Sequence, residues 1–376
     1  MNPADTRVEA NRYLTDQLIT YIGNKRSLLG FIGRGVEKAK ERLGKDRLRC
    51  FDVFSGSGVV ARYLKRHSSF LHANDLERYA AVVNRCYLSN ADERDDATIR
   101  EAVSFVNERA AERAATSSAP GFISELYAPD DDEHIREGER VFYTTRNARF
   151  IDAARSLIGE LPHDMQDYVL APLLYEASVH ANTSGVFKGF YKNSETGKGQ
   201  FGGNGRDALG RILADIHLPM PVFSDIHSAY RVTQGDANEA ARASEETYDL
   251  AYVDPPYNQH PYGSNYFMLN LIASYERPEQ VSDVSGIPRD WNRSPYNKRQ
   301  KIGAVFEDLI EHLEAKLVLI SYNSEGFMEK DEMTSLLEGF GSVETVSTRY
   351  NAFRGSRNLN QRDLYVTEHL FLLEKS

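Results

Sequence analysis

A run of β-forming residues at 248–253 stops abruptly at the sequence Asp254-Pro255-Pro256-Tyr257. Two consecutive prolines can neither extend a strand ladder nor start a helix freely, so the run predicts a strand that ends where the acid begins. In an open α/β sheet, ligands bind beyond the carboxyl ends of the strands. The pattern therefore predicts an α/β sheet with a ligand site next to Asp254.

The four residues after this strand place hydrogen-bond acceptors beside a flat ring. The Asp254 carboxylate and the Pro255 carbonyl oxygen can accept hydrogen bonds, and the Tyr257 ring can stack on a planar partner. This combination suits an exocyclic amino group on a flat heterocycle, because holding both N–H groups leaves the nitrogen lone pair free to attack an electrophile. A strand-terminating turn with an exposed acid is the alternative interpretation.

A second strand, predicted over 47–54, leads into a glycine-rich turn that contains Gly56 and Gly58. A helical pattern follows at once, and this order opens a Rossmann-like unit in which the backbone can approach a nucleotide-like ligand. Ala61 stands where a dinucleotide-binding pattern has its third glycine. The turn therefore favours a nucleoside ligand without a pyrophosphate and argues against a nicotinamide oxidoreductase.

Two further strands are predicted to end in an acid. The segment 70–75 ends at Asp75, about 20 residues after the glycine turn, where an acid typically binds the hydroxyl pair of a ribose. A helix N-cap is the alternative role for Asp75. The segment 231–236 ends in Gly235 and Asp236.

Tyr21 and Lys25 precede a helical pattern near the start of the chain. Gly23 and Asn24 favour a turn there, which places Tyr21 and Lys25 beside exposed backbone N–H groups that attract an anionic or carboxylate-bearing ligand. A surface turn with a solvated Lys25 explains the same residues equally well.

The alternation of strands and helices stops after residue 92, and charged helical stretches replace it. A loop rich in Gly, Lys and aromatic residues follows at 183–211, where rings and cations alternate: Phe187, Lys188, Phe190, Tyr191 and Lys192. This alternation suits phosphate contact and base stacking. We interpret the region as an inserted recognition domain, with a flexible surface insertion as the alternative. The predicted division is a first catalytic part over 1–92, an insertion over 93–225 and a second catalytic part over 226–376.

The net charge of −10 is unusual for a protein that binds nucleic acid. A basic cleft can exist on an acidic protein, so the charge requires local basic segments rather than excluding nucleic acid. The segments 293–301 and 351–358 are two further basic segments, in addition to the loop at 183–211. The final strands, 343–350 and 364–373, are predicted to form an antiparallel pair.

Cys50 and Cys86 are the two cysteines, which excludes a disulfide framework and leaves too few thiolates for a structural zinc site. No apolar run approaches the roughly 20 residues of a membrane span, and the first residues have no apolar signal-peptide core. We expect a cytoplasmic setting.

Together, these motifs resemble the Dam-like family of adenine-N6-specific DNA methyltransferases with the alpha-type motif order. The segments that carry the resemblance are YIGNKRSLL, FDVFSGSG, HANDLE, GDANE, DPPYNQHPYGSNY, LISYNSEG and YNAFRGSRN. The resemblance implies a Rossmann-like class I S-adenosylmethionine-dependent methyltransferase sheet with an inserted, mostly helical target-recognition domain. It also implies S-adenosyl-L-methionine as methyl donor, duplex DNA as substrate and no metal.

The resemblance assigns roles residue by residue. Donor-binding residues would be Tyr21, Lys25, Asp52, Phe54, Gly56, Gly58, Asp75 and Asp236. Catalytic residues would be Asp254, Pro255, Pro256 and Tyr257, which hold a flipped-out adenine. Expected DNA contacts are Lys188, Tyr191, Lys192, Arg293, Lys298, Arg354 and Arg357.

Partners and rival activities stay open on the sequence alone. A monomer that acts alone or beside a separate restriction endonuclease would fit. An RNA adenine-N6 methyltransferase and a catalytically silent DNA-binding relative are the main rivals. A cytosine-N4 enzyme would more often carry serine at position 254.

Overall fold

The structure is a computed structural model that describes residues 12–116, 121–203, 208–351 and 365–376. Arg354 and Arg357, two of the expected DNA contacts, lie outside the described residues. Their role stays a prediction.

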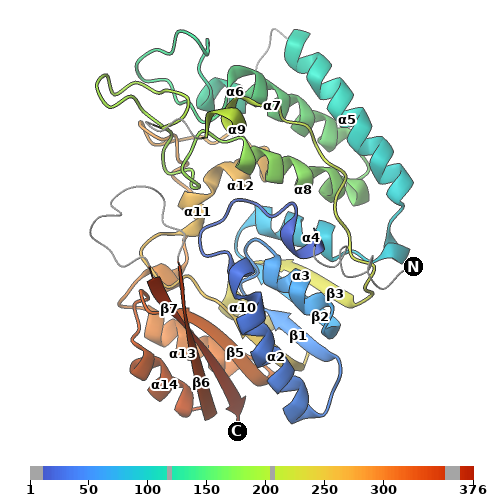
Figure 1. Ribbon diagram of the computed structural model, residues 1–376, viewed down its shortest axis with the longest axis vertical. Coiled ribbons are helices and arrows are strands. Elements are labelled where there is room, and N and C mark those ends of the chain that lie inside the picture. Colours follow the sequence, from blue (N-terminus) through green and yellow to red (C-terminus); the bar gives the residue numbers. More distant parts are fainter. Residues whose placement is uncertain (1–11, 117–120, 204–207, 352–364) are drawn as a thin grey trace.

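A seven-stranded sheet with the order β3-β2-β1-β4-β5-β7-β6 forms one half of the molecule (Figure 1). Neighbouring strands are parallel from β3 to β5, whereas β7 runs antiparallel to both β5 and β6. The strand bounds are Leu48–Asp52 for β1, Ser68–Asp75 for β2, Ala229–Gln234 for β3, Tyr248–Val253 for β4, Ala315–Asn323 for β5, Gly341–Asn351 for β6 and Tyr365–Lys375 for β7. The predicted sheet class and the antiparallel final pair are confirmed.

The strand order reverses between β1 and β4, and this reversal fixes where a ligand can bind. Every residue of β4 is buried, which is why its sequence is a continuous apolar run. Since β1 and β4 lead to opposite halves of the sheet, a crevice opens beyond their carboxyl ends. Asp52 ends β1 and Asp254 follows β4 directly, so both flank that crevice.

Helices cover both faces of the sheet. One face packs against α2 (Leu29–Leu43) and α3 (Val59–Lys65), whose apolar side chains share a core with β1, β4 and β5. The other face packs against α10 (Ala237–Ala243), α13 (Ile302–His312) and α14 (Lys330–Glu338). Two layers of helices on a mostly parallel sheet leave its carboxyl edge as the open side.

A helical lobe lies above the sheet in Figure 1, with α4 (Arg78–Leu88) between them. Its helices are α5 (Asp96–Thr116), α6 (Phe122–Tyr127), α7 (Thr145–Glu160), α8 (His163–Val179) and α9 (Leu209–Leu213). They belong to the inserted region, which is mostly helical as expected.

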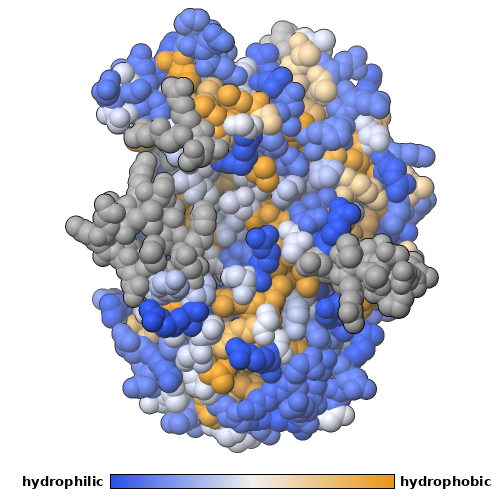
Figure 2. Space-filling model, viewed as in Figure 1, coloured by the Kyte–Doolittle hydropathy of each residue, from blue (hydrophilic) through white to orange (hydrophobic). Residues whose placement is uncertain are grey.

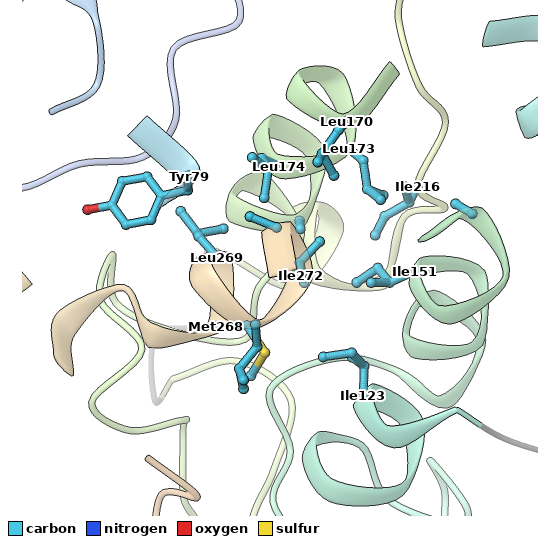
Figure 3. Packing of buried hydrophobic residues seen from close by; sticks show 14 of the residues in the cluster. Tyr79, Ile123, Ile151, Leu170, Leu173, Leu174, Ile216, Met268, Leu269 and Ile272 are labelled. Carbon is cyan, nitrogen blue, oxygen red and sulfur yellow. The ribbon is translucent and has the colours of Figure 1, made fainter. Parts of the chain in front are cut away.

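A segment that follows β4 also packs into this lobe. It forms α11 (Tyr262–Asn265) and α12 (Phe267–Ser274), and Figure 3 shows Leu269 and Ile272 of α12 among leucines of α8. Arg155 of α7 fixes the end of α12 by donating to its last carbonyl groups, at 2.8 Å to Ile272 and 3.2 Å to Ala273. The region predicted as the second catalytic part therefore contributes a helix to the core of the helical lobe.

Hydrophilic residues dominate the face shown in Figure 2, with hydrophobic residues visible along its middle. Within the described ranges, no helix is both long and apolar enough to cross a membrane.

Candidate active site

A pocket of about 840 Å³, open to solvent, lies at the carboxyl ends of the parallel strands. Eight of the predicted site residues line it: Tyr21, Lys25, Phe54, Gly56, Asp75, Asp236, Asp254 and Pro256. Four others, Asp52, Gly58, Pro255 and Tyr257, are not among its lining residues but lie within two positions of one of these eight in the chain. The structure thus gathers residues that are widely separated in sequence around one cavity.

The glycine turn has a backbone that only glycine adopts readily. Gly56 and Gly58 have φ angles of +50° and +77°. A Cβ on Gly56 would lie 3.2 Å from the Tyr21 ring, and one on Gly58 would lie 3.1 Å from Asn84 Oδ1. The Gly56 N–H donates to Asp75 Oδ2 at 2.8 Å, which ties the turn to the end of β2.

Two carboxylates lie at the end of β2, and the sequence predicted only one of them. Asp75 Oδ1 accepts from the Glu77 N–H at 2.9 Å. Burial raises the pKa of Asp75 to about 6, although its N–H partners oppose the shift. Glu77, which sequence reasoning missed, is buried and also lines the pocket. Burial and the neighbouring Asp75 raise its pKa to about 7, and Asn270 and Asn292 donate to it.

Asp52, at the end of β1, is a buried carboxylate without a hydrogen-bond partner among the described residues. Burial, with Asp254 and Asp75 nearby, raises its pKa well above the usual range, although the backbone N–H of Phe54 opposes the shift. A carboxylate in this position needs either a proton or a positively charged ligand.

Lys25 lies at the start of the 3-10 helix η1 (Lys25–Leu28) and reaches two carboxylates. Its Nζ is 3.1 Å from Asp254 Oδ1 and 2.9 Å from Glu368 Oε1, and lies 5.7 Å from the centre of the Tyr257 ring. Burial alone would lower the pKa of Lys25, but Asp254 and Glu368 outweigh it and raise the pKa well above the usual range. Lys25 is therefore a buried ammonium, and its interpretation as a solvated surface residue is wrong.

Asp254 sits between opposing electrostatic effects. Burial raises its pKa, the Lys25 ammonium lowers it and the Glu368 carboxylate raises it again, to about 7. Sequence reasoning missed Glu368. The signal that could have found it is an acid in the first half of β7, shortly before the apolar run 370–373.

Aromatic rings pack around the two ends of the pocket. Tyr21 stacks on Tyr262 with ring centres 4.9 Å apart and on Tyr266 at 4.7 Å. Tyr257 meets Tyr322 edge to face at 5.8 Å. These contacts hold Tyr21 and Tyr257 in place from the protein side.

Asp236 caps α10, since its side chain accepts from the N–H groups of Asn238 and Glu239. Phe54 meets Tyr296 edge to face at 5.1 Å. Both Phe54 and Asp236 line the pocket, so their predicted contact with a donor stays a prediction supported by position.

The expectation that rings of the loop at 183–211 stack on bases is wrong for Phe187 and Phe190. Both are buried and pack against Phe142 in the helical lobe. The apolar drive to bury a phenylalanine outweighs its use as an exposed platform. Lys188 and Lys192 are exposed, and Tyr191 is partly exposed, so these three remain expected DNA contacts.

The second basic segment forms part of the pocket wall, which its charge alone did not indicate. Asn292, Ser294, Tyr296 and Asn297 line the pocket. The exposed Arg293 guanidinium lies 4.4 Å from the Trp291 ring centre and donates to two backbone carbonyl groups. Lys298, at the end of η3 (Pro295–Asn297), is exposed. Arg293 and Lys298 are therefore neighbours in the chain of residues that line the pocket.

Comparison with known proteins adds independent findings. The family model of the D12 class N6 adenine-specific DNA methyltransferases matches residues 21–201 and 220–336. Type II methyltransferase M.NlaIII of Neisseria lactamica is 29% identical over 368 residues, which cover 95% of this chain and 100% of that protein. Type II methyltransferase M.CviAII of Paramecium bursaria Chlorella virus 1 is 28% identical, with 94% of this chain and 98% of that protein covered. Type II methyltransferase M.FokI of Planomicrobium okeanokoites is 27% identical over 94% of this chain but only 52% of its own length.

Proposed function

Because the chain belongs to the D12 class N6 adenine-specific DNA methyltransferase family, we propose that it transfers a methyl group from S-adenosyl-L-methionine to the N6 amine of an adenine flipped out of duplex DNA. The observation that carries this proposal is the shared pocket. The glycine turn after β1 and the Asp254 motif after β4 open onto the same cavity.

The donor end of the pocket fits a cationic nucleoside. S-adenosyl-L-methionine supplies an electrophilic methyl group on a positively charged sulfur and carries an ammonium group as well. Asp52 provides a buried carboxylate with no hydrogen-bond partner among the described residues, and its charge would favour a positively charged ligand in the adjoining pocket. Asp75 and Glu77 can accept hydrogen bonds from ribose hydroxyls, and the glycine turn lets the backbone approach the ligand.

At the target end, we expect Asp254 and the Pro255 carbonyl oxygen to accept hydrogen bonds from the two N–H groups of the amine. These acceptors orient the nitrogen and stabilise the positive charge that grows on it during transfer. The Lys25 ammonium, 3.1 Å from Asp254 Oδ1, favours the ionised carboxylate. No strong general base is required, since the methylated ammonium loses its extra proton readily.

The target adenine must leave the duplex, because its N6 is paired and stacked there. Unstacking costs a few kcal/mol, which stacking on the Tyr257 ring and hydrogen bonds to the base edge offset. The names of the relatives support a place in a restriction–modification pair, with a separate endonuclease as partner.

The test is transfer of a labelled methyl group to unmethylated duplex DNA, followed by mapping of the modified base. We expect N6-methyladenine at one short sequence, and a rate in Asp254→Ala that falls by at least about 100-fold while donor affinity stays within a few fold. Asp331→Ala, an exposed acid on α14, is the matched control. Transfer at the wild-type rate in Asp254→Ala, or transfer to RNA alone, would contradict the proposal.

A further inference from the structure

The antiparallel course of β7 brings a residue from the last strand to the ligand edge of the sheet. The parallel strands β4 and β5 end at this edge, whereas β7 begins there. Glu368, near the start of β7, pairs in register with Asn323, the last residue of β5. A parallel strand would place its first residues at the opposite edge.

The Glu368 carboxylate is held on both oxygens. It has no exposed surface. Oε1 lies 2.9 Å from Lys25 Nζ and accepts from Ser321 Oγ at 2.5 Å, while Asn323 Nδ2 donates to Oε2 at 3.4 Å. Since Glu368 cannot turn toward solvent, its position relative to Lys25 is fixed.

One ammonium therefore serves two buried carboxylates. Lys25 is 3% exposed and Glu368 is 0% exposed, whereas the Asp254 side chain is 18% exposed and lines the pocket. An ammonium has three N–H donors, and a second carboxylate acceptor draws part of its charge away from the first. The ion pair with Asp254 is made through Oδ1, which leaves Oδ2 as the acceptor on the other side of the carboxylate.

We propose that Glu368 is a positioning residue for methyl transfer: it shares the Lys25 ammonium with Asp254, so that Lys25 orients the Asp254 carboxylate without fully neutralising its charge. This inference rests on the proposed function. Without the Glu368 charge, Lys25 would pair with Asp254 alone, and the target amine would meet a weaker acceptor.

The groups that face this cluster come from several elements, and few of them titrate near neutral pH. The carboxylates are Asp254, Glu368 and Asp52, and Lys25 is the cation. The facing phenols are Tyr252, Tyr257, Tyr262 and Tyr350, whose pKa values burial raises. These phenols therefore stay neutral in the range where enzymes are assayed. A change in the acidic part of a pH profile then reports on Asp254, whose pKa burial raises to about 7.

The experiment compares single-turnover methylation rates of wild type, Glu368→Gln and Glu368→Asp across about pH 5 to 9. In Glu368→Gln we expect a rate lower by about 10- to 100-fold and a midpoint of the acidic limb lower by about one pH unit, because a repelling charge is removed. Glu368→Asp should restore part of the rate and should move the midpoint part of the way back to its wild-type pH. Donor affinity, measured by calorimetry without DNA, should stay within a few fold of wild type.

Three results would overturn the inference. One is a Glu368→Gln enzyme with the wild-type rate. Another is a lower rate with an unmoved midpoint, which a purely structural role would produce. The third is a parallel loss of donor binding and transfer. If Glu368→Gln does not fold, Ser321→Ala, which removes one hydrogen bond to Glu368, should slow transfer by a smaller factor, and an unchanged rate would overturn the inference.

The wild-type enzyme separates the two claims. If it transfers no methyl group to adenine in DNA, the proposed function fails. If it does and Glu368→Gln is indistinguishable from it, only the role of Glu368 fails.

Discussion

The two ends of the pocket handle buried negative charge in opposite ways. At the donor end, Asp52, Asp75 and Glu77 are buried, and none of them forms an ion pair within the part of the chain that the structure describes. At the target end, Asp254 and Glu368 share the Lys25 ammonium. The contrast matches the proposed ligands: the donor brings its own positive charge, whereas the adenine amine is neutral until it reacts.

Replacing Lys25 by methionine should have the largest effect, because it removes the cation that pairs with both Asp254 and Glu368. Two buried carboxylates would then face each other, and breaking a buried ion pair costs about 3–5 kcal/mol. We expect a large loss of stability in denaturant unfolding and a loss of transfer. Arg85→Met, which breaks a more exposed ion pair with Asp167, is a control expected to change stability little. A Lys25→Met enzyme as stable as the control would contradict a charge-balanced target end.

Asp52→Asn should have the opposite effect on the stability of the protein without donor. The substitution keeps the shape and removes a carboxylate that has no hydrogen-bond partner among the described residues, so the stability of the free enzyme should stay equal or rise. Donor affinity should fall by about tenfold or more, since a charge-assisted interaction is lost. Calorimetry measures the expected fall in donor affinity, and thermal unfolding of the same samples measures the expected equal or higher stability. Unchanged donor affinity would contradict the idea that unpaired carboxylates at the donor end of the pocket attract a cationic ligand.

Gly58→Ala tests whether the donor end depends on backbone shape as well as charge. A left-handed backbone costs an alanine about 1–2 kcal/mol, and the new Cβ would lie 3.1 Å from Asn84 Oδ1. We expect lower stability and weaker donor binding. Gly44→Ala is the matched control, because Gly44 is also left-handed at +61° but has open space around it. It should lose stability and keep donor affinity, and equal losses of affinity would argue against a specific role for the turn.

The smallest predicted effect is a pH dependence that belongs to the donor end. Asp75 has a pKa of about 6 in the folded protein against an ordinary value of 3.8, and Glu77 one of about 7 against 4.5. The folded state thus holds these protons more tightly than the unfolded chain, so the free energy of unfolding falls as pH rises from about 4 to 7. A cationic donor favours the ionised carboxylates, so its affinity should rise over the same range with release of protons. Donor titrations in buffers of different ionisation enthalpy measure that release, and a flat affinity would contradict it.

Local patterns allowed prediction of the strands and of the two motifs that end them. The run at 248–253 matches β4 residue for residue, because a strand buried on both faces must be apolar throughout. The glycine turn was predictable for a similar reason, since a left-handed backbone restricts the residue type at Gly56 and Gly58.

Partners across the fold were not predictable from one sequence. Glu368 looked like an ordinary acid in a strand, and only the sheet order places it beside Lys25. Phe187 and Phe190 fit an exposed pattern of rings and cations, yet both are buried. The place of α12 in the core of the helical lobe depends on tertiary packing between distant segments.

The reversed direction of β7 also bears on the order in which activity returns during folding. Asp52, Gly56 and Asp75 lie close together in the chain, so the part of the donor end around β1 and β2 needs mainly local contacts. The target end needs Lys25 from the first described segment and Glu368 from the last one, and contacts between distant residues form late because closing a long loop is entropically unfavourable. A refolding sample should therefore regain donor binding before methyl transfer, and the lag between the two signals would report the docking of the final strand.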